Sequence, residues 1–268
     1  MTTSKLFDLT GRVAMVTGAA RGLGRAIAMA VADHGADCML VDWNAEGLAE
    51  TAEQIRAKGR RVATACRNMS HVEEVERLFE EFDREFDRID FQANVAGGDV
   101  VLEKPEDASA ENVERAWRGL VLGRFCMCQQ AGRRMIRQGT GSIVNIGSLA
   151  SITALGRGHI SYSMAMGAVA QMTRELSTEW SAHGIRVNAI LPAQVVNPSL
   201  VERMEADPGL KDRWLKGIPR GRLGQPEDIQ GLAVLLASDA SSWITGALIP
   251  MDGGNLAMNA GGTRRYVD

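Results

Sequence analysis

The feature of this sequence that most constrains its fold is a regular alternation of short apolar runs with amphipathic stretches. The apolar runs have the length of strands and cover residues 12–17, 38–42, 62–66, 90–93, 142–146 and 186–190. The stretches between them carry apolar residues at helical spacing and cover residues 25–34, 45–58, 72–86, 110–137 and 160–182. Strands that alternate with helices form parallel sheets, because parallel strands need a helix-sized connection. The sequence therefore predicts an α/β fold, a doubly wound parallel sheet with helices on both faces.

Nothing in the sequence divides this sheet into two domains. The chain has 268 residues, of which 45% are hydrophobic and 24% charged, as in a globular protein, and it has no linker or shift in composition. We therefore expect one domain over residues 1–268. Residues 192–226 interrupt the alternation with five prolines and many charges, which is typical of a lid over a substrate site. The Gly- and Asn-rich tail after about residue 254 is expected on the surface.

Charge and cysteine content argue against several classes of protein. The formal net charge is −3 and no basic cluster stands out, so nucleic acid is not an expected partner. No segment has the apolar density of a membrane span, and the N-terminus lacks the apolar core of a signal peptide. The cysteines and histidines show no metal-ligand spacing. We expect a cytoplasmic protein that binds no metal and keeps reduced the cysteines Cys38, Cys66, Cys126 and Cys128.

A glycine-rich turn, Thr17-Gly18-Ala19-Ala20-Arg21-Gly22-Leu23-Gly24, joins the first expected strand to the first expected helix. Gly18 permits the tight turn, Gly22 lets the backbone approach a pyrophosphate, and Gly24 lets the helix pack closely on the strand. The free N–H groups and the positive dipole end of that helix favour a bound phosphate. These features predict a Rossmann-type dinucleotide site, against the alternative of a glycine-rich turn that binds no ligand.

The nature of the dinucleotide is predicted from Asp42, which lies 18 residues after Gly24 at the end of the second expected strand. Its carboxylate would accept hydrogen bonds from both hydroxyls of the adenosine ribose and would repel a 2′-phosphate. The neighbouring Trp43 offers such a phosphate no positive charge. The sequence therefore predicts NAD as the cofactor rather than NADP.

With Asn94-Val95-Ala96-Gly97, Ser148 and Tyr162, the glycine-rich turn resembles the classical short-chain dehydrogenases/reductases. The resemblance runs over about residues 7–254 and includes residues 141–146, 184–188, 224–229 and 245–254. It implies a sheet of about seven strands and hydride transfer between nicotinamide and a carbonyl or alcohol carbon. Tyr162 would be the general acid/base, and Ser148 would hold the substrate oxygen.

The resemblance also implies which residues bind the cofactor and how the chain assembles. Helices over residues 110–137 and 160–182 would pack against their copies in a homotetramer or homodimer, and the near absence of charge over residues 160–173 agrees with burial. A hetero-oligomer with an active paralogue is the alternative. The implied cofactor-binding residues are Gly18, Arg21, Gly22, Leu23, Gly24, Asp42, Trp43, Asn68, Met69, Asn94, Ala96, Gly97, Tyr162, Pro192 and Val195.

Two catalytic positions depart from the family's pattern. Four residues after the tyrosine the family has a lysine, which binds the nicotinamide ribose and lowers the tyrosine pKa, whereas this chain has Met166. Leu120 stands where the family has an asparagine that completes a water relay, and Asn68 replaces a usual aspartate. Without that lysine the tyrosine keeps a pKa of about 10 and is protonated at neutral pH. Alcohol oxidation, which needs the phenolate, should therefore lose about 10² in rate. Ketone reduction, which uses the protonated form, should lose less.

Other cations in the sequence are candidate substitutes for the lysine. Arg157 and His159 lie in the loop expected to line the substrate pocket. For Arg157 we favour a solvated charge over contact with a substrate anion, and for His159 an ordinary loop residue over a surrogate acid/base. Arg118 and Arg124 flank Leu120 and are expected on the helix surface or at a subunit interface.

Three functions are compatible with these residues. The first is an NAD(H)-dependent oxidoreductase that interconverts a sugar- or polyol-like secondary alcohol and its ketone. Residues 192–214 and 221–224 resemble the corresponding segments of polyol and sugar dehydrogenases. The second is a catalytically impaired NAD-binding homologue that serves as a partner or regulatory subunit, which Met166 and Leu120 favour. An engineered Met166, introduced in place of a lysine to delete its charge, is a further alternative. The third, a non-redox Ser/Tyr enzyme, is disfavoured because that branch loses the cofactor loop. We favour the first.

Overall fold

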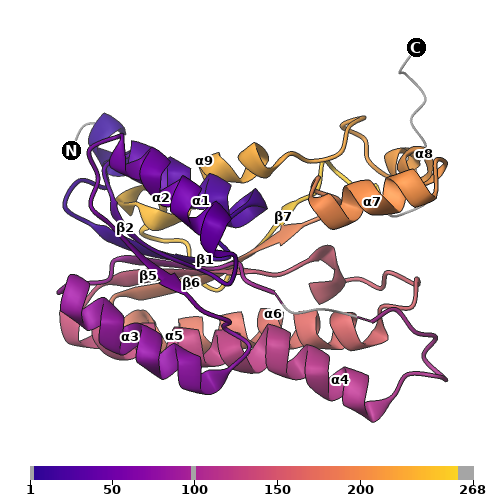
Figure 1. Cartoon of the computed structure of the whole chain (residues 1–268), viewed down its shortest axis with the longest axis horizontal. Helices are drawn as coiled ribbons and strands as arrows, with labels where there is room; N and C mark the ends of the chain where they lie inside the picture. The colour runs from indigo at the N-terminus through magenta and orange to yellow at the C-terminus, as the bar shows by residue number, and fades with distance from the viewer. Residues whose placement is uncertain (1–2, 98–100, 259–268) are drawn as a thin grey trace.

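A central parallel sheet lies between two layers of helices in this computed structural model, which describes residues 3–97 and 101–258 (Figure 1). Over these residues the sheet has seven strands in the order β3-β2-β1-β4-β5-β6-β7, and each neighbouring pair is parallel. The predicted doubly wound α/β fold is therefore confirmed. The strands are β1 (Val13–Thr17), β2 (Asp37–Asp42), β3 (Val62–Cys66), β4 (Phe91–Asn94), β5 (Gly141–Ile146), β6 (Ile185–Pro192) and β7 (Leu248–Met251).

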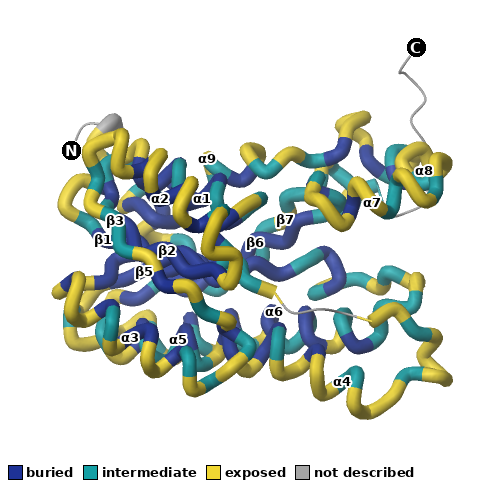
Figure 2. The backbone as a smooth tube through the Cα atoms, viewed as in Figure 1, coloured by how far each residue is buried: buried dark blue, intermediate teal, exposed yellow. Residues whose placement is uncertain are grey.

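The helices that connect the strands divide between the two faces of the sheet (Figure 1). One layer contains α1 (Gly22–Asp33), α2 (Ala45–Arg56) and α9 (Gln230–Ala237). The other contains α3 (Val72–Glu85), α4 (Ala110–Trp117), α5 (Gly123–Gln138) and α6 (Ile160–Trp180). Figure 2 shows the buried strands enclosed between these layers, with exposed residues on the outer faces of the helices.

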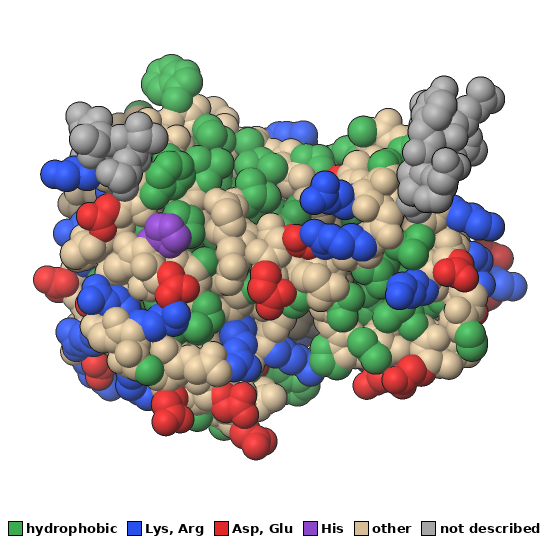
Figure 3. All heavy atoms as spheres, turned by 90° about the horizontal axis from the view of Figure 1, so that it is seen from above, with side chains coloured by type: hydrophobic (Ala, Val, Ile, Leu, Met, Phe, Trp, Pro, Cys, Tyr) green, Lys and Arg blue, Asp and Glu red, His purple; other side chains and the backbone are tan. Residues whose placement is uncertain are grey.

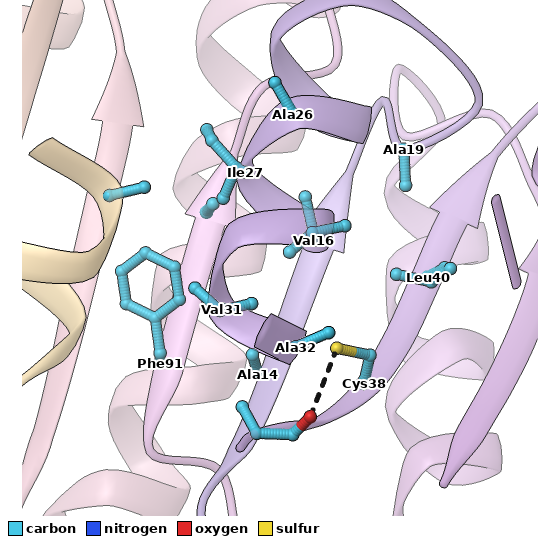
Figure 4. Packing of buried hydrophobic residues seen from close by; sticks show 14 of the residues in the cluster. Ala14, Val16, Ala19, Ala26, Ile27, Val31, Ala32, Cys38, Leu40 and Phe91 are labelled. Carbon is cyan, nitrogen blue, oxygen red and sulfur yellow. Dashed lines mark hydrogen bonds between the residues drawn. The ribbon is translucent and has the colours of Figure 1, made fainter. Parts of the chain in front are cut away.

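The core is double, because successive side chains of a strand point to opposite faces of the sheet. In β1, Val16 packs into the cluster beneath α1, whereas Met15 packs into the cluster on the other face. Figure 4 shows the first cluster, which includes Val16 and Leu40 of the sheet and Ile27 of α1. Strands that are buried on both faces read as continuous apolar runs, which is why the sequence identified them.

Two regions differ from a regular strand–helix alternation. Residues 192–226, expected as a lid, contain two short helices, α7 (Pro198–Ala206) and α8 (Leu210–Lys216), which pack around Leu200 and Trp214. The expected helix over residues 110–137 is interrupted by a π-helical turn, η2 (Arg118–Leu122). At the end of that turn, a Cβ on Gly123 would lie 1.9 Å from the carbonyl oxygen of Met69. The helix therefore passes directly over the segment that follows β3.

Charges of both signs are mixed on the surface. The described residues contain neither a group of side chains suited to bind a metal ion nor a helix that could span a membrane. On the face shown in Figure 3, Lys and Arg side chains lie beside Asp and Glu side chains, with no large patch of one sign. Within residues 3–97 and 101–258 no helix has the length and apolar character needed to cross a bilayer. Over the same residues, no three His, Cys, Asp or Glu side chains gather where they could hold a metal ion.

Gly24→Ala should destabilise the fold, because its Cβ would lie 2.0 Å from the carbonyl oxygen of Gly18 and the obstacle is backbone. We expect the free energy of unfolding in urea to fall by about 1–3 kcal/mol, although alanine is the better helix former. Gly231→Ala in α9 is the matched control, because its Cβ would meet nothing within 4 Å. This change should raise the free energy of unfolding by at most about 1 kcal/mol. A gain in stability for both variants would show that α1 can move away from β1 to admit a side chain at position 24.

Candidate active site

A cleft of about 1250 Å³ opens at the carboxyl ends of the strands, where doubly wound sheets bind ligands. It is larger than most small-molecule pockets, as an extended dinucleotide requires. Among its lining residues are most of those expected to bind the cofactor: Gly18, Arg21, Gly22, Leu23, Gly24, Asp42, Trp43, Asn68, Met69, Ala96, Gly97 and Val195. Asn94, Tyr162 and Pro192 do not line it.

The glycine-rich turn is held against the segment that follows β4. The hydroxyl of Thr17 accepts hydrogen bonds from the backbone N–H groups of Val95 (3.0 Å) and Ala96 (3.1 Å). Gly18 has φ +69°, and a Cβ there would lie 3.1 Å from the nitrogen of Ala96. The positive φ and this close approach together require glycine. The helix N-terminus of α1 is thereby directed at the cleft, where a phosphate could bind its free N–H groups.

Asp42 is a fixed carboxylate at the end of β2. It accepts hydrogen bonds from the backbone N–H groups of Ala20 (3.0 Å) and Asn44 (2.9 Å) and is 8% exposed. Trp43 beside it is 70% exposed and brings no charge. A carboxylate oxygen has lone pairs beyond one hydrogen bond, so Asp42 could also accept from ribose hydroxyls. The donors and acceptors of the cleft thus suit an NAD-type dinucleotide.

Asn94 takes part in a buried polar network that the sequence pattern did not predict. Its amide nitrogen donates to the side-chain oxygen of Asn145 (3.0 Å), and its own side-chain oxygen accepts from Gln92 (2.8 Å). Asn145 in turn donates to the hydroxyl of Thr173 on α6 (3.1 Å). The network joins β4, β5 and α6 below the site. The side chain of Asn94 is therefore engaged within the protein, which leaves its backbone for any contact with a ligand.

The side chains of Ser148 and Tyr162 form a hydrogen bond, and neither residue lines the cleft. Ser148 follows β5, and its hydroxyl accepts a hydrogen bond from the backbone of Ala150 (3.2 Å), which fixes the turn. Tyr162 lies in the first turn of α6. Burial raises the pKa of the Tyr162 phenol, while the hydrogen bond from Ser148 and the charge of Arg124 oppose this shift in pKa. Two neighbouring hydroxyl groups of this kind could bind the oxygen of a substrate and exchange a proton with it.

Met166 and Leu120 belong to the apolar cluster against which Tyr162 packs. They are 2% and 3% exposed, and they pack in one cluster with Ala165 and the tyrosine ring. Neither side chain offers a charge or a hydrogen-bond donor. The environment of Tyr162 on this side is therefore apolar, which contributes to the raised pKa of its phenol.

Arg124 is the clearest correction to the expectations from sequence, which placed it on the helix surface or at an interface. It is 6% exposed, and its guanidinium donates to the carbonyl oxygens of Leu120 and of Ala96 (3.2 Å to the latter). The π-helical turn inserts a residue ahead of α5 and so rotates the following side chains by about 100°. The expectation was wrong because spacing along the chain does not show how far this turn rotates the side chains that follow it. Arg118 is exposed and lines the cleft.

Arg157 and His159 lie beside Tyr162 in the loop before α6, and Arg203 of α7 faces them. The rings of His159 and Tyr162 are 6.1 Å apart. Burial and the nearby Arg203 lower the pKa of Arg157. Burial first, and then the charges of both arginines, lower the pKa of His159. Arg157 is exposed, as expected for a solvated charge, and together with Arg203 it could bind an anionic group of a substrate.

Comparison with known proteins identifies the family. Residues 18–255 match the family described as enoyl-(acyl carrier protein) reductase. A D-threitol dehydrogenase of Mycolicibacterium smegmatis is 38% identical over 249 residues, 92% of this chain and 94% of that enzyme. An NAD-dependent glycerol dehydrogenase of Listeria innocua is 36% identical over 250 residues, 93% of this chain and 96% of that enzyme.

The fold is shared with solved dehydrogenases over nearly the whole chain. A gluconate 5-dehydrogenase of Burkholderia cenocepacia, solved in complex with NADP and tartrate, superposes with a TM-score of 0.87 at 30% identity. The match covers 96% of this chain and 99% of that one. Family match, identity and coverage agree with the cleft and with the paired Ser148 and Tyr162. The chain therefore belongs to the short-chain dehydrogenase/reductase family and is an oxidoreductase.

Proposed function

We propose that this oxidoreductase of secondary alcohols and ketones uses NAD(H) as its cofactor and a polyol- or sugar-like compound as its substrate. The observations that carry the proposal are the hydrogen-bonded pair of Ser148 and Tyr162 and a dinucleotide-sized cleft that Asp42 lines. The threitol and glycerol dehydrogenases among its relatives support the substrate class. Arg157 and Arg203 extend this class to sugar acids, because a carboxylate would bind between them.

The preference for NAD is argued from this chain's own residues. The similar gluconate 5-dehydrogenase was solved with NADP and the similar glycerol dehydrogenase is NAD-dependent, so the relatives do not decide. Here the carboxylate of Asp42 is buried and held by two backbone N–H groups, so it cannot turn away from a 2′-phosphate. Burying that phosphate against a fixed negative charge would be unfavourable.

A bound nicotinamide would accept or donate the hydride, and the protein would accept or donate the proton. In oxidation, the Tyr162 phenolate takes the proton of the substrate hydroxyl, which the Ser148 hydroxyl holds in place. In reduction the phenol returns a proton to the same oxygen. Because the pKa of Tyr162 is raised above its usual value, the phenol form dominates at neutral pH and oxidation requires an alkaline pH.

A second candidate function is an NAD-binding partner or regulatory subunit with little turnover of its own. The burial of Met166 and Leu120 in an apolar cluster favours it, because neither can stabilise a phenolate. Turnover of polyols, sugar acids or their ketones separates the two functions. A protein that binds NADH but turns over no member of such a panel at any pH would support the second.

Replacing Asp42 by asparagine should reduce the preference for NAD. Asp42→Asn keeps the shape and deletes the charge, so the ratio of the dissociation constants for NADPH and NADH should fall by about tenfold or more. Fluorescence titration of each cofactor measures this ratio. Asp37→Asn, at the opposite end of β2, is the matched control and should leave it unchanged. Equal affinities for both cofactors in the unmodified protein would overturn the assignment of NAD.

Met166→Lys should shift the pH profile of oxidation. A cation one helical turn from Tyr162 would lower the pKa of its phenol by about 1–3 units, so oxidation would level off at lower pH and neutral-pH turnover would rise by about tenfold or more. The measurement is kcat for a polyol and sugar-acid panel across the alkaline range. An unchanged profile, together with rapid turnover by the unmodified protein at neutral pH, would show that another group already supplies the charge.

We also propose a homo-oligomer built on the helix layer that contains α4 to α6. Exposed apolar side chains on this layer are Trp117, Leu122, Phe125, Ile136 and Met164. Light scattering at micromolar concentration should give a dimer or tetramer mass. Ile136→Glu should weaken association by at least about tenfold, whereas Val201→Glu on α7 should not. A monomeric mass for the unmodified protein would refute the proposal.

A further inference from the structure

We propose that Arg124 is a positioning residue that supplies a positive charge to Tyr162 in place of the lysine that this chain lacks. The inference rests on the proposed function in one respect, the role of Tyr162 as the acid/base. It assigns to α5 a task that the family pattern assigns to α6.

Arg124 is a buried cation without an acidic partner. None of the ion pairs formed among residues 3–97 and 101–258 includes it. Within the same residues its Nε is buried and has no hydrogen-bond partner. A guanidinium stays protonated in proteins, and buried charges are ordinarily paired because desolvation is costly. The structure thus retains a positive charge that the described residues do not neutralise.

Tyr162 is the group whose ionisation would compensate this charge. Two titratable side chains interact electrostatically with Arg124, Cys128 of α5 and Tyr162 of α6. Burial raises the pKa of the Cys128 thiol to about 12, so the thiol is neutral. The two residues whose carbonyl groups it binds, Leu120 and Ala96, carry no titratable group. The charge of Arg124 therefore acts on the phenol of Tyr162, and it favours the phenolate.

The position of the charge is fixed from both sides. One arm of the guanidinium holds the carbonyl of Leu120, whose side chain packs in the cluster of Tyr162 and Met166. The other arm holds the carbonyl of Ala96, next to the cofactor cleft. A charge that is oriented before the reaction needs no rearrangement when the phenolate forms. Arg124 is buried and the ring of Tyr162 packs against an apolar cluster, so water screens their interaction less than it would at the surface.

A direct test measures the ionisation of Tyr162 without any substrate. The chain has two tyrosines, Tyr162 and Tyr266, of which the second lies outside the described residues. In a Tyr266→Phe background, the ultraviolet absorption of tyrosinate therefore reports Tyr162 alone. Adding Arg124→Gln, which keeps a donor and deletes the charge, should move this titration to higher pH by about one unit. Adding Arg124→Lys should leave it near its original position.

Kinetics of the full-length protein then separate charge from scaffolding. Arg124→Gln should lower neutral-pH oxidation by about tenfold, and Arg124→Gln with Met166→Lys should recover that loss. Arg84→Gln removes an exposed charge from α3 and should change neither readout. If Arg124→Gln does not fold, Arg124→Leu, which buries no charge, serves in its place.

The outcomes distinguish this inference from the proposed function. A tyrosinate titration that Arg124→Gln leaves unmoved would overturn the role of Arg124, whatever the protein oxidises. A loss of activity that Arg124→Lys and Met166→Lys both fail to restore would also overturn it, because Arg124 would then only tie two carbonyl groups together. A shifted titration in a protein that oxidises no polyol or sugar acid would leave Arg124 in its role and refute the substrate class.

Discussion

The hydroxyl of Thr17 joins the two halves of the site, and the rest of its geometry depends on that junction. It binds the backbone of Val95 and Ala96, so the end of β1 and the segment after β4 form one wall. On one side of this wall the glycine-rich turn continues to α1. On the other side the carbonyl of Ala96 accepts from Arg124, which holds the π-helical turn beside Tyr162. The cofactor cleft and the acid/base Tyr162 therefore both depend on the backbone groups of Val95 and Ala96.

Sequence patterns predicted the sheet and the cofactor turn because both follow from local spacing. Continuous apolar runs mark strands buried on two faces. The close packing predicted at Gly24 is present, because a Cβ at that position would lie 2.0 Å from the carbonyl oxygen of Gly18. Arg124 escaped prediction because one π-helical turn changes the phase of every residue after it. The network around Asn94 escaped as well, because polar contacts between neighbouring strands depend on their order in the sheet, which spacing along the chain does not encode.

Burial acts on Tyr162 and Arg124 in opposite senses. It raises the pKa of the phenol and lowers the pKa of the guanidinium, because both shifts favour the neutral form. Each charged form is in turn favoured by the other. The phenol is the partner that can change its charge, since a guanidinium remains protonated. Above the pKa of Tyr162 the phenolate compensates the charge of Arg124, and below it the arginine relies on the carbonyl groups of Leu120 and Ala96.

A lysine at position 166 would act on the same tyrosine as Arg124. It would bring a second cation into the apolar cluster against which Tyr162 packs, with a single phenolate to neutralise both. Two like charges in one desolvated pocket disfavour each other's charged form. A cation on α5 and a cation on α6 are thus alternative ways to tune the same tyrosine. Met166 and Arg124 are two parts of one arrangement, in which the charge comes from the helix that also carries the π-helical turn.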